Sequence, residues 1–96
     1  MILTPLAVAF QFIIEAKKLG IDDIEYSKDG KYSKKIVICN YERLHYFDSN
    51  NFVAVILDES SILKNFDGKI KGQITSFIKK IPYRFYLQQH QAQMIL

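Results

Sequence analysis

Cysteine, tryptophan, proline and glycine are all scarce in this chain of 96 residues, and their scarcity excludes several classes of protein. The single cysteine, Cys39, cannot form an internal disulfide and offers no zinc-ligand spacing. No apolar run reaches the roughly 18 residues that a membrane span requires, and the apolar start lacks the basic segment of a signal peptide. We therefore expect a cytoplasmic protein without a membrane partner, in which Cys39 packs as a buried thiol.

A phosphate-binding loop is also missing from the sequence. The four glycines are isolated from one another: Gly20, Gly30, Gly68 and Gly72. No G-x-x-x-x-G-K-[ST] pattern, which would cradle nucleotide phosphates, occurs anywhere. A hydrolase built from Ser60 or Ser61 with His45 would need a G-x-S-x-G turn, which is absent too. We expect His45 to lie partly buried in a short helix instead.

The amino-acid composition of the chain is that of an ordinary globular domain. Hydrophobic residues make up 49% of the chain and charged residues 24%, and the net charge of +3 is only a weak sign of a polyanionic partner. The six tyrosines could include residues that stack on nucleic-acid bases, although most are expected to pack in the core or at its rim. They are Tyr26, Tyr32, Tyr41, Tyr46, Tyr83 and Tyr86.

Hydrophobic periodicity and turn residues predict an alternation of strands and helices. Strands are expected at residues 1–3, 21–26, 35–39, 53–57 and 83–87, and helices at 5–19, 41–46 and 69–80. Thr4 is the expected N-cap of the first helix with Pro5 at its first position, Gly20 is its expected end, and Asn40 is the expected N-cap of the second helix. This order predicts a three-layer α/β domain with a mainly parallel sheet and right-handed crossovers. The tail, residues 88–96, has neither a strand nor a capped-helix pattern.

The apolar run at residues 53–57 ends abruptly in Asp58 and Glu59. A run this apolar predicts a strand that is buried on both faces. Ligands of open α/β sheets bind at the carboxyl ends of such strands. Asp58 could hold Mg²⁺ and Glu59 could orient a water toward a γ-phosphate, as in a Walker B element. By spacing alone, two solvated acidic residues that begin a loop explain the pair about as well.

Three stretches together resemble conserved motifs of one family. LTPLAVAFQFIIEAKKLGI is similar to motif Ia, ICNYERLHYFD to motif Ib, and FVAVILDESSILKNFDGK to motif II of the superfamily 2 DNA helicases and translocases of the Swi/Snf-related type. This family is DEAD/DEAH-box-like, and the three stretches are most similar to its phage-type members. The resemblance covers roughly residues 3–87 and lies in the first RecA-like lobe, and motif II is its most specific part.

The resemblance implies a fold, ligands and residue roles. The fold would be part of a three-layer RecA-like (P-loop NTPase-type) domain with a mainly parallel sheet. In the intact parent, ATP and Mg²⁺ would be the cofactors and DNA the partner. Asp58 would hold Mg²⁺ through water, and Glu59 would be the catalytic base. Four residues would lie near the nucleic-acid backbone: Thr4, Pro5, Asn40 and Tyr41.

The chain also departs from the family pattern. The phosphate-binding loop, motif III and the second lobe are not found in it, so we expect the isolated chain to bind no cofactor and to be catalytically inactive. Residues 1–87 would be a partial ATP-binding lobe and residues 88–96 a non-homologous tail. The codons of QQHQAQM permit a motif III reading one base earlier, which suggests a shifted reading frame near Leu87.

Two other functions fit the same residues. One is a stand-alone, non-catalytic α/β protein that binds nucleic acid. The other is one part of a split helicase whose missing parts bind in trans.

Overall fold

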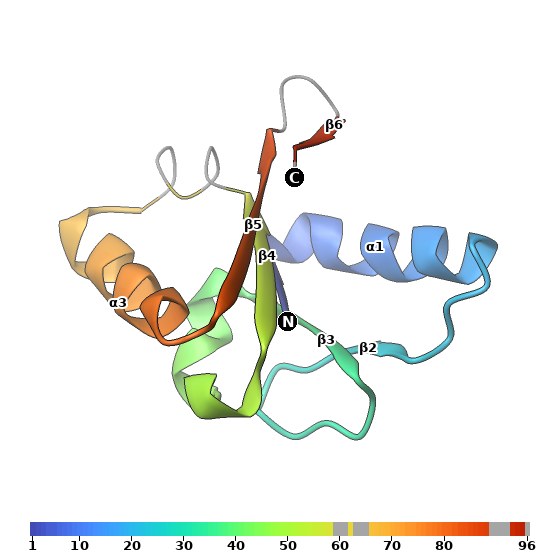
Figure 1. Cartoon of the computed structure of the whole chain (residues 1–96), viewed down its shortest axis with the longest axis horizontal. Coiled ribbons are helices and arrows are strands. Elements are labelled where there is room, and N and C mark those ends of the chain that lie inside the picture. Colours follow the sequence, from blue (N-terminus) through green and yellow to red (C-terminus); the bar gives the residue numbers. More distant parts are fainter. Residues whose placement is uncertain (59–61, 63–65, 89–92, 96) are drawn as a thin grey trace. The chain divides into compact units, whose positions relative to one another are not determined.

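The computed structural model describes residues 1–58, 62, 66–88 and 93–95. The chain divides into two compact units, Met1–Phe47 (unit 1) and Asp48–Leu96 (unit 2), whose elements are labelled in Figure 1. Each unit contains both helices and strands, which confirms the predicted α/β class. None of the helices in the described ranges is long and apolar enough to cross a membrane.

Unit 1 is built on three parallel strands. β1 (Ile2–Thr4), β2 (Ile24–Tyr26) and β3 (Ile36–Asn40) lie in the order β2-β3-β1, so that β3 pairs on both sides. Residues 37–39 of β3 and Leu3 of β1 are fully buried. This burial confirms the strand predicted at residues 35–39 and the buried thiol within it.

The first helix, α1 (Leu6–Lys18), packs against β2 and β3. Its C-terminal end follows the prediction, because Gly20 adopts a positive φ of 82°, which a residue without a Cβ reaches at no steric cost. The amide of Ile21 donates to the carbonyl oxygen of Ala16 at 2.8 Å. This bond closes the helix with a Schellman-type turn.

Of the two N-caps predicted in unit 1, Thr4 is wrong, whereas Asn40 does occupy the N-cap position. Thr4 belongs to β1, and Pro5, which has no side-chain acceptor, occupies the cap position of α1. Asn40 precedes the 3₁₀ helix η1 (Tyr41–Tyr46), but its side chain makes no capping hydrogen bond. Both polar residues are also the last residues of a strand, because β1 and β3 remain paired through Thr4 and Asn40.

The strand predicted at residues 21–26 begins only at Ile24. Ile21 still belongs to the end of α1. Asp23 then contacts the start of β3: its carbonyl oxygen accepts from the amide of Ile36 at 3.0 Å and its carboxylate from the amide of Lys35 at 3.1 Å. The aspartate therefore joins the two strand starts and is not itself a strand residue.

Residues 27–35, here called the β2–β3 connection, fold back on themselves through side-chain acceptors. The Glu25 carboxylate accepts from the amides of Ser33 at 2.8 Å and Lys34 at 2.7 Å. The Ser27 hydroxyl donates to the carbonyl oxygen of Lys31 at 2.8 Å. The hydrogen bonds to Glu25 lower the pKa of its side chain, because they favour the charged carboxylate.

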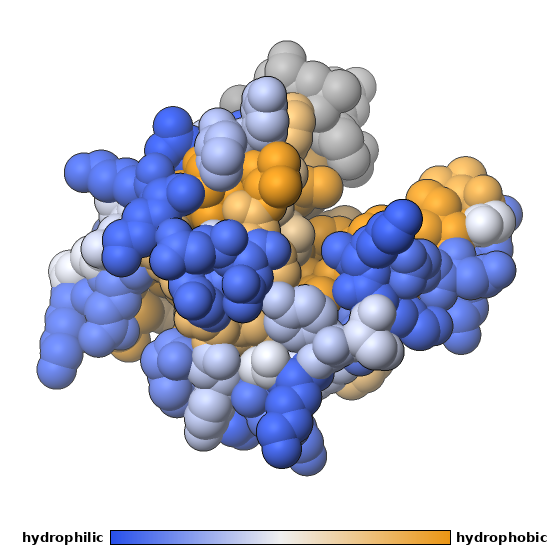
Figure 2. Space-filling view, turned by 60° about the horizontal axis from the view of Figure 1, so that its bottom comes forward, coloured by the Kyte–Doolittle hydropathy of each residue, from blue (hydrophilic) through white to orange (hydrophobic). Residues whose placement is uncertain are grey.

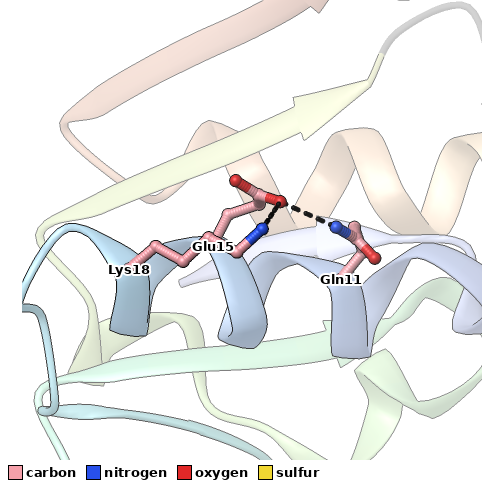
Figure 3. Close-up of polar contacts among 3 residues, drawn as sticks. All are labelled: Gln11, Glu15 and Lys18. Carbon is pink, nitrogen blue, oxygen red and sulfur yellow. Dashed lines mark hydrogen bonds and ion pairs between the residues drawn. The ribbon is translucent and has the colours of Figure 1, made fainter.

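The exposed side of α1 combines a polar cluster with apolar side chains. Gln11 donates to the Glu15 carboxylate at 2.8 Å, and the Lys18 ammonium lies 3.5 Å from the same oxygen (Figure 3). Leu6, Phe10 and Ile14 are each about half exposed, and Leu19 is more exposed still. In Figure 2, hydrophobic residues reach the surface at the right of the view, where Figure 1 shows the end of α1.

Unit 2 contains a parallel strand pair with an antiparallel addition. β4 (Ala54–Asp58) pairs in parallel with β5 (Tyr83–Gln88), and β6 (Gln93–Ile95) pairs antiparallel with β5. The expectation that the tail contains no strand is therefore wrong. In β4, Val55 and Leu57 are fully buried, whereas the alternate residues Ala54 and Ile56 are half-buried. The predicted burial on both faces is complete on only one.

The helix predicted at residues 69–80 is α3 (Gly68–Lys79). Asp67 is its N-cap, and its carboxylate accepts from the amides of Lys69 and Ile70 at 3.2 and 3.3 Å. Ile74 and Ile78 form its buried stripe. Before β4, the 3₁₀ helix η2 (Ser49–Asn51), which was not predicted, is capped by Asp48. Residues 60–66, where the sequence has no clear period and we expect a loop or a short helical turn, lie largely outside the described residues.

Candidate functional site

The carboxyl ends of β1 and β3 bring together the four residues expected near nucleic acid. Thr4 lies directly opposite Asn40 in the parallel register. Pro5 and Tyr41 each follow one of these residues, so they leave the sheet of unit 1 at the same edge. Sequence spacing of 35 residues or more separates the two pairs, and only the strand pairing makes them neighbours. This edge is the position at which open α/β sheets bind ligands.

Three of these four side chains are buried. The exposed fraction is 2% for Thr4, 5% for Asn40 and 3% for Tyr41, whereas Pro5 is partly exposed. Thr4 Oγ1 has no hydrogen-bond partner among the described residues. A ligand at this edge would therefore meet backbone groups and the residues around the strand ends before it reached these side chains.

Asn40 is held by neighbours that the sequence did not single out. The Tyr26 hydroxyl donates to Asn40 Oδ1 at 2.6 Å, and Asn40 Nδ2 donates to the Glu42 carboxylate at 3.4 Å. Burial raises the pKa of the Tyr26 hydroxyl. Because Tyr26 ends β2, all three strands of unit 1 end in a polar residue: Thr4, Tyr26 and Asn40. The sequence signal for Thr4 and Asn40 was a polar residue directly after an apolar run, whereas β2 (Ile24–Tyr26) has no such run and Tyr26 had no signal of this kind.

The N-terminus of α1 opens at the same edge without a side-chain cap. The first N–H groups of any helix have no partner inside the helix. Within the described part of the chain, the cap residue contributes no side-chain hydrogen bond to them, and the first turn contains no acidic residue. The backbone turns into the helix at Pro5, whose carbonyl oxygen accepts from the amide of Val8 at 3.0 Å. The helix dipole and the N–H groups that precede Val8 together favour an anion at this position.

Asp58 is the last residue of β4, opposite Leu87 of β5. Its backbone therefore lies at the carboxyl end of a buried parallel strand, as the sequence predicted. Glu59 and the side chain of Asp58 are outside the described residues, and so are Ser60 and Ser61. Across the ranges that are described, no group of three or more His, Cys, Asp and Glu residues could hold a metal ion.

His45 and Cys39 occupy different environments from each other. His45 lies in the predicted short helix but is exposed, so the expected partial burial is wrong. Its ring contacts that of Tyr46 at a centroid distance of 4.1 Å. Cys39 is fully buried, and burial raises the pKa of its thiol to about 12. A thiol with such a pKa is a packing group and a poor nucleophile.

Comparisons of the chain with models of protein families, with curated proteins and with solved structures found no match.

Proposed function

We propose that this chain is part of the first RecA-like lobe of an ATP-dependent DNA helicase or translocase, whose intact form hydrolyses ATP to move along DNA. The support is the resemblance of three stretches to motifs Ia, Ib and II of that family, in the family's order. The parallel α/β pairing in each unit is compatible with such a lobe. Motif Ia would place α1 at the nucleic acid, and motif II would place Asp58 at the nucleotide.

The uncapped N-terminus of α1 carries the nucleic-acid part of the proposal. It presents backbone N–H groups at the edge where Thr4 and Asn40 end their strands. A phosphate of the nucleic-acid backbone is an anion of the size that helix N-termini bind. The Thr4 hydroxyl, which lacks a partner among the described residues, could donate to a second phosphate oxygen after a small shift.

The nucleotide part of the proposal concerns the intact parent. Asp58 would hold Mg²⁺ through water and Glu59 would orient the attacking water, while Mg²⁺ would neutralise charge on the phosphates. The phosphate-cradling loop is not in this sequence. The chain by itself should therefore bind DNA but not turn over ATP.

Binding of fluorescein-labelled DNA, followed by fluorescence anisotropy over a series of NaCl concentrations, tests the α1 site. Replacing Ala7 with Glu puts a carboxylate in the first turn, where it would occupy the anion position and also stabilise the helix. Ala7→Glu should weaken DNA binding about tenfold or more and make the dependence on salt less steep.

Two matched controls separate this effect from side-chain size and net charge. Ala7→Gln adds the same bulk without charge, and Gln73→Glu adds the same charge at an exposed position of α3. Both should change binding less than threefold. Equal losses in Ala7→Glu and Gln73→Glu would mean that only net charge matters, and the α1 site would be wrong.

A stand-alone, non-catalytic nucleic-acid-binding protein is the second candidate. The observation that favours it is the absence of the phosphate-binding loop from the sequence. The split-helicase alternative differs from it in one result. Only a split helicase would hydrolyse ATP when a polypeptide that supplies the phosphate-binding loop and the second lobe is added in trans.

A further inference from the structure

A second surface of unit 1 combines aromatic rings with positive charge. The β2–β3 connection packs directly on the end of η1. A Cβ at Gly30 would collide with the carbonyl oxygen of Tyr46, and the rings of Tyr32 and Phe47 stack with centroids 6.2 Å apart and an interplanar angle of 21°. These two contacts, one on each side of residue 31, fix the connection against η1. The loop is therefore a docked part of unit 1.

Tyr46 is the most accessible ring of this surface. Its exposed fraction is 48%, and that of Tyr32 is 36%. The guanidinium of Arg43 lies 6.0 Å from the Tyr46 ring centroid, at the outer limit of a cation–π contact. Tyr46 is therefore a half-exposed ring beside an arginine and a histidine.

The segment that carries these rings contains more basic than acidic residues, and acidic residues flank it at Asp23, Glu25 and Asp48. Residues 27–47 contain five basic and two acidic residues. The basic ones are Lys28, Lys31, Lys34, Lys35 and Arg43, and the acidic ones are Asp29 and Glu42. The only ion pair within the described ranges is elsewhere, on α1.

The acidic groups of this segment are used for local structure. Asp29 accepts from the amide of Lys31 at 3.1 Å, and these local hydrogen bonds lower its pKa. The Glu42 carboxylate accepts from Asn40. Figure 1 shows the β2–β3 connection at the bottom of the view, and Figure 2, turned so that the bottom comes forward, shows a largely hydrophilic face.

We infer that this surface, here called the connection surface (Lys28, Lys31, Tyr32, Arg43 and Tyr46), binds single-stranded nucleic acid, with unpaired bases stacked on Tyr46 and phosphates neutralised by the lysines and Arg43. Exposed rings interleaved with cations are how proteins bind single strands without sequence preference. In a duplex the base faces are already stacked on one another, so a duplex can contact only the basic side chains of this surface. The connection surface therefore distinguishes the two forms by stacking.

The inference rests on the proposed function for the class of ligand, and it adds a second contact and the form of the nucleic acid. The two surfaces share no residues. The connection surface uses residues of the β2–β3 connection and η1, whereas the proposed phosphate site lies at the start of α1. Each of the two proposed sites can therefore be disproved without affecting the other.

Three fluorescein-labelled probes of equal length test the stacking: a thymidine oligomer, a strand in which the sugars carry no bases, and a duplex. The thymidine oligomer should bind the full chain about tenfold more tightly than the abasic strand, which has the same phosphates. Tyr46→Ala should weaken the thymidine oligomer about tenfold and leave the abasic strand unchanged. Tyr46→Phe, which keeps the ring, should bind like the parent sequence.

Separate variants test the contribution of charge and control for a loss of folding. The double substitution of Lys28 and Lys31 by Gln should weaken both single strands and reduce the salt slope by about 0.7 for each lysine. Tyr83→Ala, on a ring that is 60% exposed in unit 2, is the matched control and should change nothing. The far-ultraviolet circular dichroism and melting temperature of Tyr46→Ala must match those of the parent, and if they do not, Tyr46→Leu takes its place.

The outcomes separate the two proposals. If the abasic and thymidine strands bind equally, or if Tyr46→Ala leaves the thymidine oligomer unaffected, the stacking surface is wrong, whatever Ala7→Glu does. If Tyr46→Ala weakens binding but Ala7→Glu does not, the connection surface stands and the α1 site fails. Absence of binding to all three probes overturns both.

Discussion

At the scale of single residues, the polar side chains that end the strands of unit 1 differ in whether they have a hydrogen-bond partner. Asn40 accepts from the Tyr26 hydroxyl at 2.6 Å, whereas Thr4 Oγ1 has no partner among the described residues. A buried polar group left without a hydrogen bond costs about 1–3 kcal/mol. A bound phosphate that accepts from the Thr4 hydroxyl would recover part of this free energy, so the unsatisfied group is consistent with a ligand position.

Cys39 gives the clearest dependence on pH. Its pKa in the folded chain is about 12, raised from an ordinary value of 9.0 by burial and secondarily by Glu42. The unfolded chain loses the thiol proton first as pH rises, so the contribution of Cys39 to the free energy of unfolding is fully present below pH 9. That contribution declines as pH rises from about 9 to about 12.

Alkylation with iodoacetamide measures the same property. At about pH 8.5 the native chain should react at least about a hundredfold more slowly than the chain in about 6 M guanidinium chloride, because the thiol is both inaccessible and protonated. Native and denatured rates that agree within a few-fold would show that Cys39 is not buried as described.

At the scale of elements, the docking of the β2–β3 connection on η1 depends on one glycine. Gly30 has a φ of 85°, and a Cβ there would collide with the Tyr46 carbonyl oxygen. Gly20 has nearly the same φ, 82°, but a Cβ at that position would meet no atom within 4 Å. The two glycines therefore separate the cost of the backbone conformation from the cost of the contact.

Gly20→Ala should lower the free energy of unfolding by about 1–2 kcal/mol, the cost of a left-handed conformation for an L-residue. Gly30→Ala should lower it by clearly more, because the connection must also move away from η1. Urea unfolding followed by circular dichroism gives both values. Equal losses in the two variants would contradict the close packing of the connection on η1.

At the scale of the whole molecule, the order of elements could be predicted from sequence because local patterns determine it. The apolar runs that became β3 and β4 and the amphipathic period that became α3 lie within a residue or two of their predicted places. The end of α1 was predictable from Gly20 for a similar reason. A glycine directly after a helical stretch is typical of a left-handed residue that ends the helix.

The predictions that were wrong concern features that depend on contacts between residues far apart in the sequence. Thr4 is a good N-cap by local preference, but its parallel pairing with Asn40 made it the last residue of β1, and Pro5 took the cap position. The tail shows no strand pattern of its own, and β6 forms by pairing with β5. Tyr26 entered the site only because three strand ends meet. The local preferences of the sequence could not predict any of these features, because tertiary pairing overrides them.

The most direct test of the central proposal observes the first amides of α1 while DNA is added. In a ¹⁵N-labelled sample, the amide signals of Leu6 and Ala7 should show the largest shifts in unit 1 outside the connection surface. The proton shifts should be downfield, as expected for an N–H that gains a phosphate acceptor. Inorganic phosphate should move the same two signals in the same direction. If DNA binds while the signals of Leu6 and Ala7 stay unchanged, the start of α1 is not the phosphate site, and the proposed role of this edge is wrong.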